Sequence, residues 1–207
     1  NYYDPSYLQV TAPSELLSVN GVKFPVVTDT FYAGTNGLKL LYKSVTGGDW
    51  AAAVAAPGWP GRDATLKDSI VFMVYSAVAV NASDLPSIFV EDLSNQRSTK
   101  IPLAQYNPLG IPAGTWTKLW LPLDTLKRNP GNCDLTRVKT IFYCQSVADG
   151  ISRTLFLDDI KMTGGASIHD YNYIVVLGSS TSAGTGANPP DSAYVNRLRK
   201  HITSLDT

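Results

Sequence analysis

This sequence of 207 residues has few cysteines, no net charge and no long apolar run. The two cysteines, Cys133 and Cys144, are too few for a disulfide scaffold or a zinc site, and they leave one disulfide or two free thiols as equal alternatives. Lysine and arginine together number 17, as do aspartate and glutamate, so the formal net charge is zero. This balance argues against nucleic acid or an anionic membrane surface as the main partner, because both attract a basic excess.

No stretch reaches the ~18 continuous apolar residues of a membrane-spanning helix. The longest apolar run, at residues 70–80, is interrupted by Tyr75 and Ser76 and is typical of a strand. The sequence begins at Asn1 without a basic segment, so we expect a secreted or extracellular protein whose signal peptide is already absent. Tyrosine, tryptophan and small polar residues are plentiful, which fits a surface of neutral polar groups and aromatic rings.

Short β-rich runs broken by turn residues extend over residues 22–162 and predict an all-β domain, a β-sandwich or jelly roll. The expected strands cover residues 24–28, 37–45, 49–55, 69–77, 87–92, 98–103, 116–123, 138–146 and 154–162. Turn formers such as Gly47-Gly48 and Pro57-Gly58 separate them. Within this region only residues 123–128 favour a helix, of one or two turns.

The pattern changes after a short linker of small residues. Residues 173–177 (YIVVL) form a continuous apolar run, as expected of a strand buried on both faces in an α/β sheet. A Gly/Ser/Thr loop follows, and apolar residues then recur at helical spacing, at Val195, Leu198, Ile202 and Leu205. We expect a β-sandwich over 1–163, a linker over 164–172 and, over 173–207, the truncated start of a second domain, too short to complete a parallel sheet.

Residues 174–186 (IVVLGSSTSAGTG) resemble the first sequence block of the SGNH, or GDSL-like, hydrolases. In those enzymes a buried strand ends in Gly-Asp-Ser, and Ser179 here replaces the aspartate, a variant that resembles carbohydrate esterases of the group. The resemblance implies an α/β hydrolase fragment in which Ser180 is the nucleophile and Gly178 permits the tight turn. The physical argument agrees, because backbone N–H groups between a strand and a helix N-terminus point at a forming oxyanion.

This serine lacks its catalytic partners in the sequence. It needs a histidine base and an acid to orient that base. The resemblance implies an Asp-x-x-His pair near the far C-terminus of such enzymes, and neither His169 nor His201 matches it, so we expect both on the surface. We therefore expect that this chain alone is not a complete enzyme, whereas the parent protein is a serine carbohydrate esterase.

Other interpretations of the glycine-rich segment are weaker. The absence of the Gly-Lys-Ser/Thr ending argues against a phosphate loop. A dinucleotide fingerprint is excluded because Gly184-Thr185-Gly186 is not followed by a third glycine. The remaining alternative is a flexible Gly/Ser-rich tail, against which the YIVVL run and the amphipathic pattern argue.

Residues 31–162 resemble the jelly-roll carbohydrate-binding modules that are attached to polysaccharide-degrading enzymes. The resemblance is carried by residues 37–40 (GLKL), 114–116 (GTW), 121–123 (LPL) and 154–161 (TLFLDDIK). It implies a polysaccharide or oligosaccharide partner and one structural Ca²⁺ that joins the early strands to the last. Asp29 and either Asp158 or Asp159 are the candidate calcium ligands, because calcium prefers hard oxygen ligands from separate segments. Capping of turns or exposure to water is the equal alternative for these aspartates.

Sugar rings present apolar C–H faces and a rim of hydroxyls, so a site for them needs flat aromatic rings beside hydrogen-bonding groups. Alternation predicts Trp120 on an outer face, opposite Leu119 and Leu121, which are expected in the core. The candidate ligand-binding residues are Trp50, Trp59, Arg62, Tyr75, Trp120, Tyr143 and Gln145. Core packing is the competing explanation for each ring, and we assign Trp116 to packing.

The sequence thus predicts a non-catalytic carbohydrate-binding module that targets an attached SGNH-type carbohydrate (acetyl) esterase to polysaccharide. Its partners would be a glycan and the remainder of the esterase domain. One alternative is a piece of a serine esterase whose catalytic remainder is cleaved off or lies on a separate chain. Another is a structural accessory domain without glycan binding.

Overall fold

The computed structural model describes residues 8–20 and 23–164. The chain divides into two compact units, Asn1–Gly164 and Gly165–Thr207. The strand and helix expected over 173–207, together with Ser180 and Gly178, lie outside the described residues.

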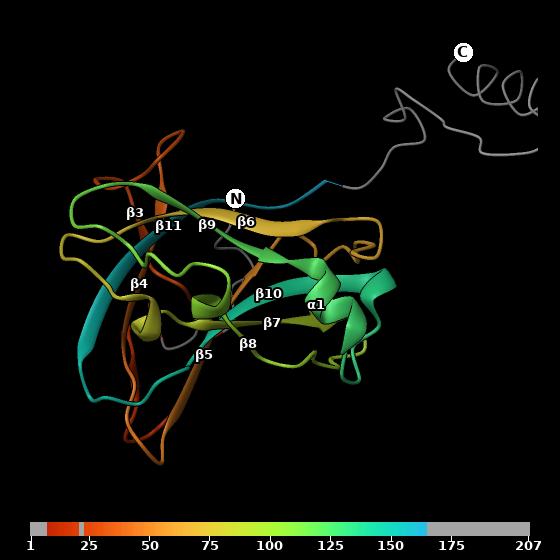
Figure 1. The fold of residues 1–207 in the computed structure, drawn as a ribbon, viewed down its shortest axis with the longest axis horizontal. Coiled ribbons are helices and arrows are strands. Elements are labelled where there is room, and N and C mark those ends of the chain that lie inside the picture. Colours follow the sequence, from red (N-terminus) through yellow and green to blue (C-terminus); the bar gives the residue numbers. More distant parts are fainter. Residues whose placement is uncertain (1–7, 21–22, 165–207) are drawn as a thin grey trace, which may run out of the picture. The chain divides into compact units, whose positions relative to one another are not determined.

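Two antiparallel sheets make up the described part of the first unit. Their strands are β1 (Leu8–Thr11), β2 (Glu15–Leu16), β3 (Val26–Val27), β4 (Gly37–Lys43), β5 (Asp49–Ala55), β6 (Ser69–Tyr75), β7 (Ser87–Asp92), β8 (Ile101–Pro102), β9 (Thr117–Pro122), β10 (Val138–Cys144) and β11 (Ser152–Thr163). The first sheet has the order β1-β5-β10-β7-β8, and the second has the order β2-β4-β11-β6-β9, with β3 also paired to β4. Figure 1 shows β6, β9 and β11 in one layer and β5, β7 and β10 in the other. The expected all-β sandwich is confirmed.

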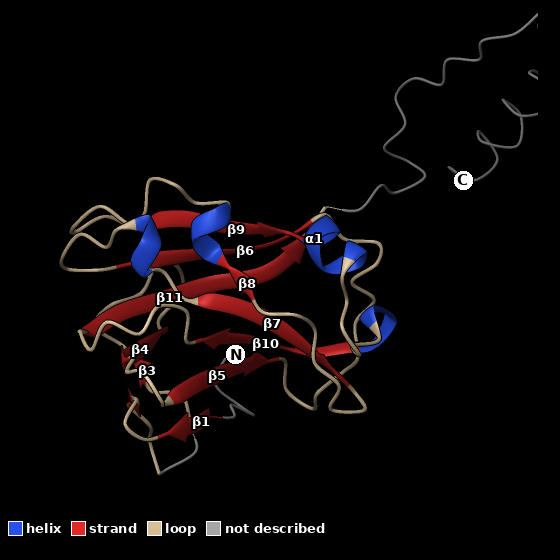
Figure 2. Ribbon diagram, turned by 60° about the horizontal axis from the view of Figure 1, so that its bottom comes forward, coloured by secondary structure: helices blue, strands red, loops and turns tan. Residues whose placement is uncertain are grey.

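Helix is confined to short segments (Figure 2). The α-helix α1 (Leu123–Arg128) has the bounds expected from the sequence, and η1 (Ala82–Asp84), η2 (Leu103–Gln105) and η3 (Leu135–Arg137) are single 3₁₀ turns. Among the described residues, no helix is long and apolar enough to cross a membrane. The sandwich therefore rests on strand pairing and on the core between the layers.

The core lies between the two sheets and follows the alternation of the strands. In β6, Ile70, Phe72 and Val74 face inward and are at most 2% exposed. The largest ring in the core is Trp50, whose Nε1 donates to Ser44 Oγ at 2.8 Å. A buried tryptophan usually finds such a partner for its N–H, because an unpaired donor in the core is costly.

Both cysteines are buried free thiols, so the disulfide alternative is wrong. Burial raises the pKa of Cys133 to about 11 and that of Cys144 to about 12. The thiols therefore stay protonated near neutral pH and act as small apolar side chains.

The buried amide of Asn107 completes the edge of the second sheet beside β9. Its Nδ2 donates to the carbonyls of Leu103 and Trp120 at 2.8 and 2.9 Å, and its Oδ1 accepts from the Trp120 N–H at 3.1 Å. The side chain thus pairs with β9 as a neighbouring strand would. This pairing fixes the backbone from which the Trp120 ring projects.

Candidate functional site

The outer faces of the two sheets differ in what they expose. On the first sheet, the outward side chains of β5, β7 and β10 form a buried cluster of Ala51, Ala53, Phe89, Phe142 and Cys144. The Arg97 guanidinium carbon lies 5.2 Å from the centre of the Phe89 ring and 5.3 Å from that of Phe142. These rings are at most 2% exposed, so they offer no open aromatic face to a ligand.

The second sheet carries half-buried aromatic rings on its outer face. Because side chains alternate along a strand, the inward residues of β6 and β11 leave Tyr75 and Phe156 facing outward. The two residues are directly opposite each other in the β6–β11 ladder, with ring centres 6.0 Å apart. Trp116, which precedes β9 by one residue, lies on the other side of Tyr75 with its ring centre 5.6 Å away.

A fourth ring comes from the loop between β3 and β4. The Tyr32 side chain is 50% exposed, and its ring centre lies 5.7 Å from that of Trp116. The loop passes close to β4 because Gly37 has no side chain: a Cβ there would lie 2.4 Å from the carbonyl oxygen of Thr30. Rings from four separate segments thus form the aromatic row, which we define as Tyr32, Trp116, Tyr75 and Phe156.

The buried carboxylate of Asp158 holds the loop of Tyr32 in place. Its Oδ2 accepts the backbone N–H groups of Tyr32 at 2.8 Å and Ala33 at 2.9 Å, and its Oδ1 accepts that of Asp159 at 2.7 Å. Three N–H dipoles stabilise a buried negative charge. Asp158 is therefore the link between β11 and one end of the aromatic row.

The contacts of this carboxylate add no support to the calcium site expected from the sequence. The three N–H groups aimed at Asp158 present partial positive charge, which is opposite to what a cation needs from its surroundings. Asp29 is exposed, and the described residues contain no group of three or more carboxylate, histidine or cysteine side chains able to hold a metal ion. Calcium binding stays a prediction without a ligand set in the described part of the chain.

Donors and a further ring extend the same face. Lys39 is opposite Phe156 in the β4–β11 ladder, and Lys118 is opposite Met73 in the β6–β9 ladder. Trp120 is 42% exposed and faces outward, as alternation predicts. Since a strand rises about 3.3 Å per residue, Trp120 starts about 13 Å from Trp116 along β9. The face therefore has two places where a ring can contact a ligand, the aromatic row and Trp120. Lys118 lies between Trp116 and Trp120 along β9, and Lys39 lies beside Phe156.

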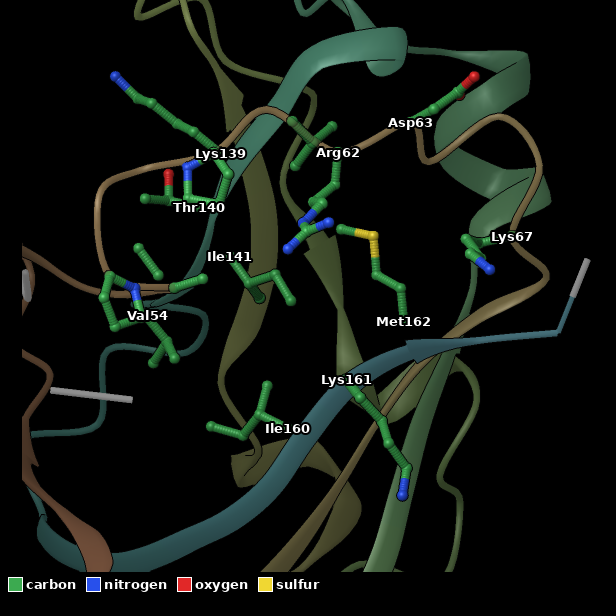
Figure 3. A pocket seen from close by; sticks show the side chains of 15 residues that line it. Val54, Arg62, Asp63, Lys67, Lys139, Thr140, Ile141, Ile160, Lys161 and Met162 are labelled. Carbon is green, nitrogen blue, oxygen red and sulfur yellow. The ribbon is translucent and has the colours of Figure 1, made fainter. Parts of the chain in front are cut away.

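Two of the predicted ligand-binding residues lie at one end of the sandwich instead. Arg62 lines a pocket of about 440 Å³ formed by the ends of β5, β10 and β11 and by the segment after β5 (Figure 3). The Trp59 ring lies near that end, with Lys139 Nζ 5.6 Å from its centre. The sequence did not separate these residues from the aromatic face, because it does not show which loops meet.

The remaining three predicted residues lie away from the outer face of the second sheet; two of them are buried, and Gln145 is half-buried. Trp50 is 1% exposed and Tyr143 is fully buried, so neither ring has a face that a surface ligand can reach. Gln145 accepts from Ser14 Oγ at 2.7 Å and donates to the Gly48 carbonyl at 3.0 Å, so its amide joins two turns. Tyr75 and Trp120 are thus the predicted residues that the structure places on the outer face of the second sheet.

Sequence reasoning missed three members of the aromatic row. Alternation carries the signal for two of them, because inward Leu155 and Leu157 place Phe156 outward, and inward Leu119 and Leu121 place position 116 outward. Tyr32 has no such signal, since its position depends on a hydrogen bond to a residue 126 positions away. Trp116, assigned to packing, does pack against Tyr75, and it does so on the open face.

No protein-family model matches this sequence. One relative, the exo β-1,2-glucooligosaccharide sophorohydrolase (non-reducing end) of Parabacteroides distasonis, is 26% identical over 162 residues. The match covers 77% of this chain and 22% of the relative, so the chain spans about a fifth of the length of the enzyme it matches.

Similar solved structures show the fold. A β-1,2-glucanase of Parabacteroides distasonis superposes with a TM-score of 0.67 at 23% identity, covering 80% of this chain and 24% of that one. The family 30 carbohydrate-binding module of a Clostridium thermocellum cellulase has a TM-score of 0.60 at 20% identity, covering 77% and 91%. The family 11 module of another cellulase of that organism has a TM-score of 0.51 at 15% identity, covering 77% and 88%. The described unit therefore has the β-sandwich fold of carbohydrate-binding modules.

Proposed function

We propose that this chain binds a polysaccharide or oligosaccharide on the outer face of its second sheet, as a non-catalytic carbohydrate-binding module. The observation that carries the proposal is the aromatic row, in which rings from four segments lie side by side with centres 5.6 to 6.0 Å apart. If these rings only packed in a core, they would be buried, as the stacked pair Phe89 and Phe142 is on the first sheet. The likeness to modules of families 11 and 30 supports the proposal at the level of the fold.

The chemistry of the face suits a glycan. Apolar C–H faces of sugar rings pack on aromatic rings, while hydroxyl groups accept hydrogen bonds from nearby donors. Lys39 and Lys118 have no ion pair or side-chain hydrogen bond among the described residues, so their ammonium groups are available as donors. The carboxylate of Asp158 is already used by three backbone N–H groups, so it does not compete for them.

The relatives suggest which glycans to test first. The sophorohydrolase is named for β-1,2-glucooligosaccharides, and a family 11 module was solved with a β-1,3-1,4-mixed-linked tetrasaccharide. We therefore propose β-linked glucan as the ligand class, with β-1,2-glucooligosaccharides as the first candidate. This assignment rests on these two similar proteins and on the aromatic rings of the face.

The experiment is calorimetric titration, or affinity electrophoresis, of the whole chain with soluble glycans of each linkage. The variant Trp116→Ala removes the central ring of the row, and we expect the affinity to fall at least about tenfold, as for a central contact residue in an interface. Trp59→Ala is the matched control, because that ring lies beside Lys139 rather than in the row. Absence of binding to every glycan, or equal losses in the two variants, would refute the proposal.

We also propose that this module acts beside an SGNH-type carbohydrate esterase in a longer, secreted protein. The support is the resemblance of residues 174–186 to the first block of those hydrolases, with Ser180 as nucleophile. In a protein that includes the complete esterase domain, Ser180→Ala should abolish acetate release and leave glycan binding unchanged. Acetate release that persists in this variant contradicts the esterase assignment without affecting the binding proposal.

A further inference from the structure

The pocket at the end of the sandwich, called the end pocket below, has an apolar floor and a charged wall. Its floor is made by side chains from both sheets: Val54 of β5, Ile141 of β10, and Ile160 and Met162 of β11. Its volume of about 440 Å³ is in the range of small-molecule sites, which run from about 300 to 1,000 Å³. A space of this size and lining can accept one sugar ring with its apolar face on the floor.

Four cationic side chains line the end pocket, and they differ in their partners. Lys139 pairs with Glu91 at 3.1 Å, and Lys161 pairs with Asp159 at 2.8 Å. Arg62 and Lys67 have no ion pair or side-chain hydrogen bond among the described residues. Figure 3 shows the Arg62 guanidinium pointing into the pocket between Ile141 and Met162, whereas Lys139 and Lys161 extend away from it. The positive charge inside the pocket is therefore not neutralised by the described side chains.

The lining carboxylate does not neutralise this charge either. Asp63 accepts hydrogen bonds from both the backbone N–H and the hydroxyl of Thr65, which lower the pKa of that carboxyl from its ordinary value. Figure 3 shows Asp63 directed away from the guanidinium of Arg62. Its charge is thus satisfied within its own turn.

The backbone of Arg62 is anchored before any ligand arrives. Its N–H donates to the Val138 carbonyl at 2.7 Å, and its carbonyl accepts from the Val138 N–H at 2.9 Å. Two residues on, the Ala64 N–H donates to the Leu135 carbonyl at 2.8 Å. Such pre-organisation lowers the ordering cost when the guanidinium binds a partner.

Besides Arg62 and Lys67, one more polar side chain of the lining has no partner among the described residues. Thr140 lines the end pocket, and its hydroxyl oxygen is buried and has no hydrogen-bond partner among the described residues. Buried hydroxyl groups are almost always hydrogen-bonded, and an unpaired one is costly.

We propose that the end pocket is a second binding site, which takes a carboxylate-bearing sugar such as a uronic acid unit. The guanidinium fork of Arg62 matches a carboxylate with two parallel hydrogen bonds, and Lys67 adds a second positive charge. The apolar floor contacts the C–H face of the sugar ring, which a simple carboxylate such as acetate does not have. The site is distinct from the aromatic row and from the glycan proposed for it.

The test uses the whole chain labelled with ¹⁵N and follows amide shifts during titration with glucuronic acid, methyl glucoside and acetate in parallel. Glucuronic acid should shift residues 62–64 and 138–141, and the affinity for it should exceed that for the other two at least about tenfold, because only it offers both a carboxylate and a ring. Arg62→Gln should reduce that affinity about tenfold, and Arg62→Lys should lie between, since lysine keeps the charge and loses the fork.

Arg128→Gln is the matched control, because this exposed arginine of α1 lines no part of the pocket. Equal affinity for glucuronic acid and methyl glucoside, or for glucuronic acid and acetate, would overturn the proposal, as would an unchanged affinity in Arg62→Gln. Trp116→Ala should leave glucuronic acid binding intact. A failure at the end pocket is therefore distinguishable from a failure at the aromatic row.

Discussion

The carboxylate of Asp158 lies 2.8 Å from the backbone nitrogen of Tyr32, although 126 residues separate them in the sequence. This hydrogen bond joins the last strand to the loop that carries the end ring of the aromatic row. A buried, charge-assisted contact of this kind has a structural and a functional consequence, because it stabilises the fold and positions a ring on the open face.

We expect Asp158→Asn to destabilise the protein and to weaken glycan binding. The new Nδ2 would point a donor at N–H groups that are themselves donors, leaving them unpaired at a cost of about 1–3 kcal/mol. Chemical denaturation measures the free energy of unfolding, and calorimetric titration measures the glycan affinity.

Asp159→Asn is the control for that variant. Its carboxylate pairs with Lys161 at the surface, and asparagine tolerates its φ of 47°. We expect a change within about 0.5 kcal/mol. Equal stability of the two variants would show that the Asp158 carboxylate does not hold the loop.

The core position of Trp50 predicts a change in stability without a change in binding. Trp50→Phe leaves Ser44 Oγ without its donor and creates a small cavity, so the free energy of unfolding should fall by about 1–3 kcal/mol. Glycan affinity at a temperature where the variant is folded should match the parent. Trp120→Phe, on the exposed face, is the control and should show little change in stability. Loss of glycan affinity in Trp50→Phe at unchanged stability would contradict the core assignment and place the Trp50 ring in a binding site.

Acid should weaken the ion pair between Asp149 and Arg153. Arg153 donates to both carboxylate oxygens, at 2.9 and 2.5 Å, and these hydrogen bonds lower the pKa of Asp149 to about 2. Because the folded pKa lies below the unfolded value of about 3.9, the pair contributes its stability above about pH 4 and loses it as the pH falls towards 2.

The stability difference between the parent and Asp149→Asn should therefore be constant at pH 5–7 and shrink between about pH 4 and pH 2. Urea denaturation over that range measures it. Asp124→Asn is the control, since that exposed carboxylate lies 3.5 Å from Lys127 across one helical turn. A gap that is independent of pH would contradict the assigned cause of the pKa shift.

Much of the fold follows from local pattern. The bounds of β5, β7 and α1 agree with those expected, because continuous β-rich runs and flanking turn residues specify them locally. The strands β1 and β2 were not expected, since they are short edge strands whose pairing depends on β5 and β4 rather than on their own composition. The alternation of side chains along β9 correctly predicted that Trp120 faces outward.

The candidate site was harder to predict because its members come from different segments. Trp50 and Trp116 both lie in β-rich surroundings, yet one packs between the sheets and the other on the open face. Alternation divides the side chains of a strand between two faces. It identifies the face that packs against the other sheet only when apolar residues are concentrated on that face. In β5, alanines lie on both faces, so the sequence does not distinguish the inward face from the outward one.

The sequence by itself determined the fold class, the turns and the orientation of side chains within strongly alternating strands, because these depend on neighbours within a few residues. Tertiary structure alone decided which sheet has an open aromatic face, and it brought Tyr32 beside Trp116 and Arg62 beside Met162. Those placements depend on strand order, ladder register and contacts between residues far apart in the chain, and hydrophobic periodicity contains no information about them.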